Sequence, residues 1–474
     1  MLRPCFDGYL TVLPAQNSAR SGAVRSPFVY AGFVVSAAAL ASLGALAAAC
    51  GSTQTGTLTL TTGGESDALT KTPAPTQLAI DAIDADGGVS SIATAKLPTQ
   101  NIDLGDRDSN SIVSIRVNAT DDSGKILLTG MTLPIEYGAL AGTSVPVFIQ
   151  RNGELARMPG NFSEARQAPV TSLVIGRYIL FGAGTNITDG TSQIYDTASL
   201  STFTGPPTLP RVPASIAAVG TDILVMDANG GTWLELSDTT TGDATAPSGG
   251  TFAEVAGGQT FDDGNGVSYV VGATRQSGAA TPRVLRIDTD GTLTFLALTE
   301  PRLGAAAAWV AGRGLVVVGG SSSGAGVEVL PPGATAASSA LAYAADATVG
   351  LSATAMDSSH VLVAGGTDST GKPQPPRLFD LGCSGTCAAV AWTGGPAIVL
   401  SPSQIFSLGF DGNAQDALLF GDDPTGASHV FRLAPTASTE IAYKVPRSGA
   451  RAVKLAIPAI AVVGGANVVE TFTP

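Results

Sequence analysis

Histidine is the side chain most often used for acid–base chemistry near neutral pH, and the 474 residues contain only two, His360 and His429. Each lies beside an apolar run that is typical of a strand, where a histidine usually has a structural role. The sequence also lacks a Ser-His-Asp context, a Walker loop and a His-Glu-x-x-His motif. We therefore expect no catalytic residue, no metal ligand and no cofactor.

The four cysteines differ in what they can do. Cys5 and Cys50 lie in, or directly after, the N-terminal segment, so only Cys383 and Cys387 are left to pair in an exported chain. Because only Ser-Gly-Thr separates these two, we expect a short structural disulfide. Half of a metal site is the alternative, although neither histidine lies nearby.

Several Asp-Gly turns have side chains that suit Ca²⁺, but the same residues are required by hairpin turns. None has the twelve-residue spacing of an EF-hand loop, so we expect ordinary turns. These turns contain residues 81–88, Asp262, Asp263 and Asn265, Asp288 and Asp290, and Asp411, Asn413 and Asp416. The stretch from Asp227 to Leu236 resembles the Asp-box of sialidase propellers, which is a structural turn and implies no hydrolysis.

The beginning of the chain is typical of an export signal. Residues 28–49 carry no charge, follow two arginines and lead through small residues into Cys50. This pattern is similar to a bacterial lipoprotein signal, which implies cleavage before Cys50 and lipidation of its thiol. Ala47 stands where that signal prefers leucine, and a signal-anchor helix is the alternative. Because the first basic region is long, we expect translation to start at or near Val24.

Composition predicts an all-β protein. The chain contains 58 glycines and 29 prolines, and it is 44% hydrophobic but only 13% charged. The formal net charge of -13 repels phosphate backbones, so we expect no nucleic-acid partner.

An apolar run that ends in Gly or Asp recurs along the sequence. Its spacing is 43 to 47 residues, except for 56 residues between the fifth and sixth copies. A fixed period of this size indicates one repeated supersecondary unit, and the short apolar run suits a strand buried on both faces. Glycine allows the sharp turn that follows. The seven marker residues are Gly182, Asp227, Gly272, Gly319, Gly365, Gly421 and Gly464.

Other features keep register with this period. Short strands such as QIYD, RVLRID and RLFD follow the marker, and a Pro- or Ala-rich strand leads into the next copy. Four short strands in about 45 residues predict one blade of a β-propeller. An arginine precedes the marker by 16 or 17 residues in four copies, at Arg166, Arg211, Arg302 and Arg447.

These motifs resemble the kelch-repeat family over about residues 149–474, although the tryptophan usual late in a kelch repeat is missing from nearly every copy. The resemblance implies a kelch-like propeller. The enzyme known on this fold is a copper radical oxidase of the galactose oxidase type, which needs two Tyr, two His and a Cys cross-linked to one Tyr. That activity would require both His360 and His429, while Cys383 and Cys387 are close enough to prefer each other.

The last copy lacks an outer strand, because only ten residues follow Gly464. We expect residues 148–159 to supply it, since Gly153 precedes Gly182 by 29 residues and Gly291 precedes Gly319 by 28. Seven blades closed in this way hide their sheet edges. Six blades with a stray strand are the alternative.

Alternating runs between residues 55 and 143 predict a small β-sandwich that looks like an immunoglobulin-like domain and serves as a spacer. The expected organisation is a signal peptide at 1–49, a lipidated Cys50 with a tether to 56, an Ig-like β-sandwich at 57–144, and the propeller at 145–474, with 145–159 as the closing strand.

The expected function is non-catalytic binding of a protein or glycan by loops on one propeller face. An insertion of about ten residues, with Cys383, Cys387 and WTGGPAIVLSPSQ, is a candidate binding loop or a structural ornament. We expect a monomer that is exported and lipid-anchored to the cell envelope, at the outer membrane of a Gram-negative bacterium. The alternatives are a propeller enzyme of oxidase or hydrolase type, which needs titratable residues converging in one pocket, and a structural envelope scaffold.

Overall fold

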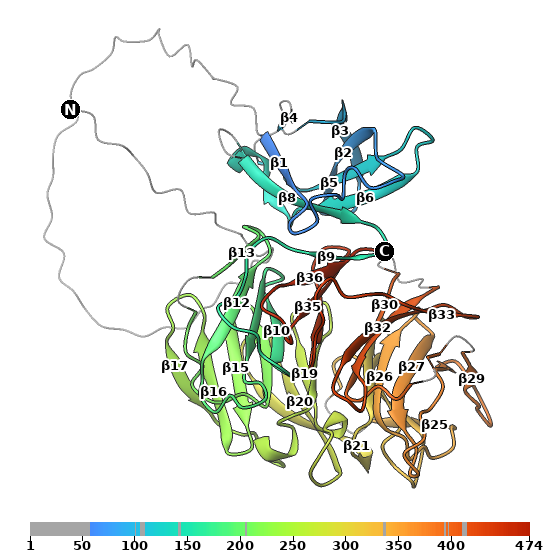
Figure 1. Cartoon of the computed structure of the whole chain (residues 1–474). Helices are drawn as coiled ribbons and strands as arrows, with labels where there is room; N and C mark the ends of the chain where they lie inside the picture. Colours follow the sequence, from blue (N-terminus) through green and yellow to red (C-terminus); the bar gives the residue numbers. More distant parts are fainter. Residues whose placement is uncertain are drawn as a thin grey trace, which may run out of the picture.

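The computed structural model describes residues 57–99, 101–104, 110–140, 144–203, 206–334, 338–392, 395–396, 398–409 and 415–474 (Figure 1). The segment at 1–49, Cys50 and the tether lie outside the described residues. Regular structure in the described part is β-strand apart from short 3-10 helices, so the all-β prediction is confirmed. No helix among these residues is long and apolar enough to cross a membrane. The 3-10 helices are η1 (Tyr137–Leu140), η2 (Phe252–Glu254) and η3 (Gly272–Thr274).

The N-terminal unit is an eight-stranded sheet with the order β3-β2-β5-β6-β8-β1-β4, in which β7 pairs with β5. Strand β1 runs parallel to β8, while the other pairs are antiparallel. Apolar residues at alternate positions, such as Leu78, Ile80 and Ala82, form its core. The immunoglobulin-like assignment stays a prediction. The strands are β1 (Thr57–Thr61), β2 (Gln77–Asp84), β3 (Val89–Lys96), β4 (Asn101–Asp103), β5 (Ile112–Thr120), β6 (Ile126–Met131), β7 (Ile135–Glu136) and β8 (Ser144–Arg151).

The rest of the chain forms seven four-stranded antiparallel sheets, so the prediction of a seven-bladed β-propeller is confirmed. Blade 1 contains β10 (Val170–Val174), β11 (Tyr178–Gly182), β12 (Ser192–Asp196) and β13 (Ser201–Thr202). Blade 2 contains β14 (Ser215–Val219), β15 (Asp222–Asp227), β16 (Gly230–Glu235) and β17 (Thr241–Ala244). Blade 3 contains β18 (Gln259–Asp262), β19 (Ser268–Val271), β20 (Thr281–Ile287) and β21 (Leu293–Arg302).

The remaining blades repeat this order from the inner to the outer strand. Blade 4 contains β22 (Ala306–Val310), β23 (Gly314–Val318), β24 (Val327–Leu330) and β25 (Ser339–Leu341). Blade 5 contains β26 (Val349–Ala355), β27 (His360–Thr367), β28 (Arg377–Asp380) and β29 (Val390–Ala391). Blade 6 contains β30 (Ser403–Ser407), β31 (Ala417–Asp422), β32 (Ser428–Leu433) and β33 (Ser438–Glu440). Blade 7 contains β34 (Arg451–Lys454), β35 (Ile460–Val463), β36 (Glu470–Phe472) and β9 (Leu155–Arg157).

Each pair of neighbouring blades encloses its own apolar core, including the pair formed by blades 7 and 1. Each marker residue stands within two residues of the end of the second strand of its blade. Gly319 shows why glycine is used there. Its φ is 79°, and a Cβ at this position would lie 2.6 Å from Leu351 Cδ1 of the next blade. The repeated glycines therefore allow both the turn and the close approach of blades.

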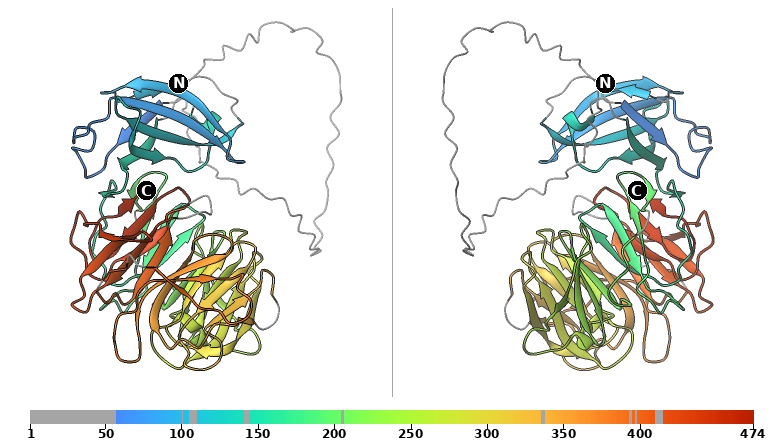
Figure 2. Two further views of the ribbon diagram at one scale, coloured as in Figure 1. Left: turned by 90° about the vertical axis from the view of Figure 1, so that its right-hand side faces the viewer. Right: turned by 90° about the vertical axis from the view of Figure 1, so that its left-hand side faces the viewer.

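Ring closure uses less of the N-terminal segment than the sequence predicted. Strand β9 pairs with β36 through Leu155–Phe472, Ala156–Thr471 and Arg157–Glu470 and supplies the missing outer strand. The expected closing segment, 145–159, also includes most of β8, and β8 pairs instead with β1 and β6. The unit boundary therefore moves from residue 145 to the three residues 152–154 between β8 and β9. Figure 2 shows from two sides that the N-terminal unit lies over the blades that close the ring.

Candidate functional site

The two ends of the propeller differ in what covers them. Hairpins that join first to second and third to fourth strands lie at one end, which we call the mounted face. The other connections lie at the opposite end, which we call the free face. The N-terminal unit contacts the mounted face at the β34–β35 hairpin of blade 7 and at the β12–β13 hairpin of blade 1. Its loop after β1 also covers β9, because Gly64 N–H donates to Arg157 O at 3.0 Å.

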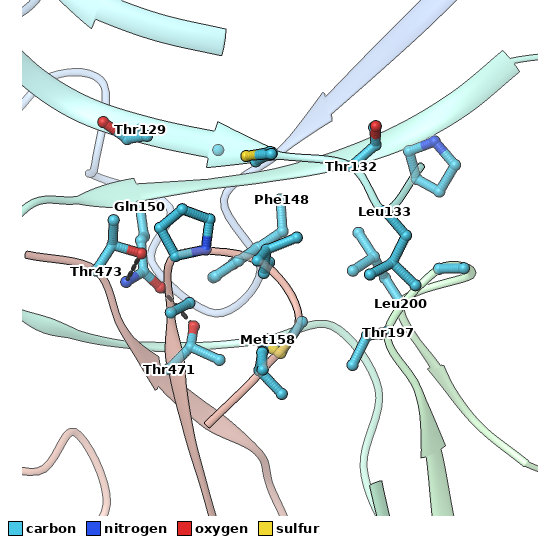
Figure 3. Close-up of a pocket in the computed structure, with 18 of the residues that line it drawn as sticks. Thr129, Thr132, Leu133, Phe148, Gln150, Met158, Thr197, Leu200, Thr471 and Thr473 are labelled. Carbon is cyan, nitrogen blue, oxygen red and sulfur yellow. Dashed lines mark hydrogen bonds between the residues drawn. The ribbon is translucent and has the colours of Figure 1, made fainter. Parts of the chain in front are cut away.

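A cavity of about 90 Å³ lies where the N-terminal unit meets blades 7 and 1 (Figure 3). Its walls are mainly apolar and include Leu133, Phe148, Met158, Leu200 and Ile457. Ligand pockets are usually several hundred Å³ in volume. The cavity therefore fits a joint between two packed units better than it fits a substrate pocket.

Gln150 ties the N-terminal unit to the C-terminal strand beside this cavity (Figure 3). Its Nε2 donates to Thr473 Oγ1 at 2.8 Å, and its Oε1 accepts from Thr471 Oγ1 at 2.5 Å. Gln150 is buried, and a buried amide must have such partners. These bonds fix the orientation of β8 against β36.

The upstream arginines hold blades together. Arg302 donates to Gly319 O at 2.7 Å and forms an ion pair with Glu328 at 2.8 Å, with both side chains fully buried. Arg447 repeats this arrangement, with Gly464 O at 2.7 Å and Glu470 at 3.2 Å. Each arginine therefore joins the end of a second strand to the third strand of the same blade.

Both pairs show the electrostatic consequences of burial. Burial alone raises the pKa of the Glu328 carboxyl. Hydrogen bonds from Ser338, Thr299 and Arg302 outweigh that effect and lower the pKa below its ordinary value. Burial lowers the pKa of Arg447. Glu328 thus acts as a structural anion in the interior of the propeller.

Arg166 and Arg211 occupy the same position with different partners. Arg166 Nη1 donates to Thr191 O at 2.6 Å, and Arg166 pairs with Glu164. Arg211 Nε donates to Thr232 Oγ1 at 2.7 Å, and Nη1 contacts Asp227 at 3.2 Å. In both blades the arginine again connects the segment before the first strand to the turn or strand after the marker.

In two other blades the ion pair has the opposite polarity. Glu254 precedes the inner strand of blade 3 and lies 3.5 Å from Arg283 on β20. Asp346 precedes the inner strand of blade 5 and lies 2.9 Å from Arg377 on β28. In these two blades the acid precedes the first strand and the arginine lies on the third strand. The ion pair is therefore kept, although no arginine stands 16 or 17 residues before the marker.

The two histidines lie at opposite ends of their blades. His360 begins the second strand of blade 5, on the mounted face, and pairs with Asp357 at 2.8 Å. His429 pairs across strands with Gly421, near the free face, and contacts Glu440 at 2.7 Å and Asp423 at 3.3 Å. They cannot share one copper ion in this arrangement. Among the described residues, no group of three or more His, Cys, Asp or Glu side chains is placed to hold a metal.

The disulfide between Cys383 and Cys387 is present in the loop between β28 and β29, which confirms the predicted pairing. The insertion is divided between the two ends of the ring. The disulfide loop lies on the mounted face, while the described part of residues 392–402 connects β29 to β30 on the free face. A single binding loop that combines both parts, as the sequence suggested, is therefore not formed.

The carboxylates of the Asp-Gly turns form hydrogen bonds or ion pairs with nearby residues of the chain. Asp263 accepts the N–H groups of Asn265 and Val267, Asp262 accepts that of Gly264, and Asp290 accepts that of Thr292. These are ordinary turn contacts. In the other candidate turns, Asp86 accepts the N–H of Gly88, Asp288 pairs with Arg286 and Asp416 with Arg432, whereas Asp411 and Asn413 lie outside the described residues.

No protein-family model and no curated protein matches this sequence. Among solved structures, the WD40 β-propeller domain of Doa1 has 12% identity and a TM-score of 0.43, over 67% of this chain and 96% of that one. The BP39L lectin from Burkholderia pseudomallei has 14% identity and a TM-score of 0.33, over 82% and 99%. The fold assignment rests on strand pairing: the protein is a seven-bladed β-propeller with an N-terminal β unit.

The residues at the joint and the carboxylates that bind the arginines were not identified from sequence. Glu328 and Glu470 lie at different distances after their glycines, so no fixed spacing marks them. Gln150 contacts residues more than 300 positions away. Buried acidic residues inside otherwise apolar third strands, as in VEVL, are the one local signal that was available.

Proposed function

We propose that this protein is a lipid-anchored cell-envelope binding protein whose free-face loops bind a protein or glycan. The observation that carries the proposal is the position of the N-terminal unit, which contacts the mounted face and the outer edge of β9. The loops of the free face lie at the other end of the ring. Loops held by a rigid scaffold are the usual place for binding residues.

The anchor is consistent with this geometry. Cys50 lies seven residues before Thr57, where β1 begins, so an extended tether spans at most about 25 Å. A lipid on Cys50 would hold the N-terminal unit near the membrane. The proposed location is the outer membrane of a Gram-negative bacterium, with the protein as a monomer.

The use of charged side chains favours binding over catalysis. The arginines at the register positions and both histidines are engaged in contacts inside the propeller. We propose a kelch-type origin for the blades, on the basis of the glycine markers and upstream arginines. We also propose an immunoglobulin-like origin for the N-terminal unit, in which β8 pairs with both β6 and β1.

Matched surface variants test the face assignment. Val349 and Ile398 are exposed apolar residues at the free face, and Ile175 is similarly exposed at the mounted face. Purified envelope proteins and polysaccharides are screened for a rise in the thermal midpoint of the full chain. Val349→Arg with Ile398→Arg is expected to abolish the rise, whereas Ile175→Arg is expected to keep it. Equal effects of both variants would contradict the assignment.

A further inference from the structure

The joint between the two units is held on one side by a carboxylate shared between two lysines. Glu154 follows β8 and precedes β9, and it accepts from Lys71 Nζ at 2.7 and 2.9 Å. Its Oε2 also accepts from Lys444 Nζ at 3.2 Å. Lys71 belongs to the N-terminal unit and Lys444 to the segment between blades 6 and 7. One side chain therefore connects both units.

Two further contacts lie on the same side of the joint. Glu65 Oε1 accepts from Arg157 Nε at 2.8 Å. Arg151 donates to Ala68 O at 3.0 Å and to Pro73 O at 2.9 Å, and also to Lys71 O. The charged groups around Glu154 are thus Lys71, Lys444, Glu65, Asp67, Arg151 and Arg157.

The other side of the joint contains the apolar cavity, beside which Phe148 of β8 packs against the apolar core shared by blades 7 and 1. Residues 152–154 are the only covalent connection between β8 and β9. The joint can open by rotation about this connection, because the cavity leaves room for the movement. Opening also breaks the hydrogen bonds of Gln150 with Thr471 and Thr473.

We propose that Glu154 is the latch of a hinge between the N-terminal unit and the propeller. When its charge bridges Lys71 and Lys444, the joint is closed and the propeller has one orientation relative to the N-terminal unit. When the bridge is screened or removed, the joint opens toward the cavity. This device does not depend on the proposed binding function.

The electrostatics of Glu154 support a charged latch at neutral pH. Burial opposes its ionisation, but hydrogen bonds from Lys71 and Lys444 outweigh this and lower its pKa below the ordinary value. The side chain is still 38% exposed, so salt screens the contact. A partly exposed ion pair is weak enough to open without unfolding either unit.

Hydrogen exchange of the full chain tests the latch. The N–H groups of Gly64 and Gly153 donate to Arg157 O and Thr473 O across the joint, at 3.0 and 2.8 Å. Glu154→Gln is expected to speed exchange in fragments that contain these two amides about two- to fivefold at low salt. At about 1 M salt the difference between the wild-type protein and the variant is expected to disappear. The variant is expected to respond less to salt, because among the described residues of the joint only the Glu65–Arg157 pair remains to be screened.

Glu440→Gln is the matched control, because it removes a carboxylate that pairs with His429 in blade 6, away from the joint. It is expected to leave exchange at Gly64 and Gly153 unchanged. Equal exchange in Glu154→Gln and wild type would overturn the proposal. An equal increase over blades 3 and 4 would overturn it as well, because it would show general destabilisation instead of opening at the joint.

Discussion

The Arg302 guanidinium, at the end of β21, and the Glu328 carboxylate, on β24 of blade 4, lie 2.8 Å apart, and neither side chain is exposed to solvent. Taking two charges out of water is costly, and it is offset only when both find several partners. Glu328 has Thr299 and Ser338 as further donors, and Arg302 has backbone oxygens that include Gly319 O. The pair fixes how the second and third strands of the blade end.

Removing one partner of this pair should be strongly destabilising. Arg302→Met leaves the buried Glu328 without its cation, and we expect a loss of about 3 to 5 kcal/mol in the free energy of unfolding. Arg211→Met is the control, since the Arg211–Asp227 pair is partly exposed, and its loss should be at most about 1 kcal/mol. Denaturant unfolding measures both values. Equal losses of unfolding free energy in the two variants would contradict the claim that burial makes the Arg302–Glu328 pair critical.

His429 should make stability depend on pH. Burial lowers the pKa of its imidazole, but the carboxylates of Glu440 and Asp423 outweigh this and raise it above the ordinary value. The folded state therefore binds the proton more tightly than the unfolded chain does. This stabilisation is complete below the unfolded pKa and is lost as pH rises through the folded pKa.

Urea midpoints at about pH 5.5 and 8.5 should therefore differ less in His429→Gln than in the wild-type protein. Because Glu440 is exposed, the effect should be at most about 1 kcal/mol. If His429→Gln and the wild-type protein showed the same difference between their two urea midpoints, the pH dependence of stability would not arise from His429.

The disulfide should contribute modestly to stability. It closes a loop of only a few residues, so the loss of chain entropy in the unfolded state corresponds to about 2 kcal/mol. The double variant Cys383→Ser with Cys387→Ser should show that loss. Reductant should lower the unfolding midpoint of the wild-type protein and leave the variant unchanged. If reductant lowered the unfolding midpoint of the wild-type protein and of the double variant equally, the change would not come from this disulfide.

Cys50 is the predicted lipidation site and can be tested in cells. Cys50→Ala should move the protein from the membrane fraction to the soluble fraction, because a free thiol is needed for the lipid. Retention in the membrane fraction would favour the signal-anchor alternative instead. Cys383→Ser is a suitable control, because it removes a cysteine of the propeller and should leave the fractionation unchanged.

The sequence allowed the propeller to be predicted because its signals are local. Each apolar run with its marker, such as the run that ends at Gly319, lies within a few residues and repeats at a nearly constant interval. The closing strand was found from the same regularity, although its length was overestimated. Residues 148–151, Phe-Ile-Gln-Arg, carry no local signal that assigns them to the N-terminal sheet instead of the closing strand.

Contacts between distant segments were not predictable in the same way. Arginine keeps its register in four blades, but blades 3 and 5 exchange the positions of acid and base, as Glu254 and Asp346 show. Glu154 and Gln150 gain their roles only when the ring closes and brings the C-terminal strand beside them. Nothing in the local sequence distinguishes these residues from ordinary surface residues.

The central claim is that the propeller binds a component of the cell envelope. The most direct measurement is the thermal midpoint of the full chain with a panel of envelope polysaccharides and envelope protein fractions. The account predicts that at least one of them raises the midpoint in a concentration-dependent way, because a ligand of the native state must stabilise it. A midpoint unchanged by every member of the panel would contradict the account and favour a structural role.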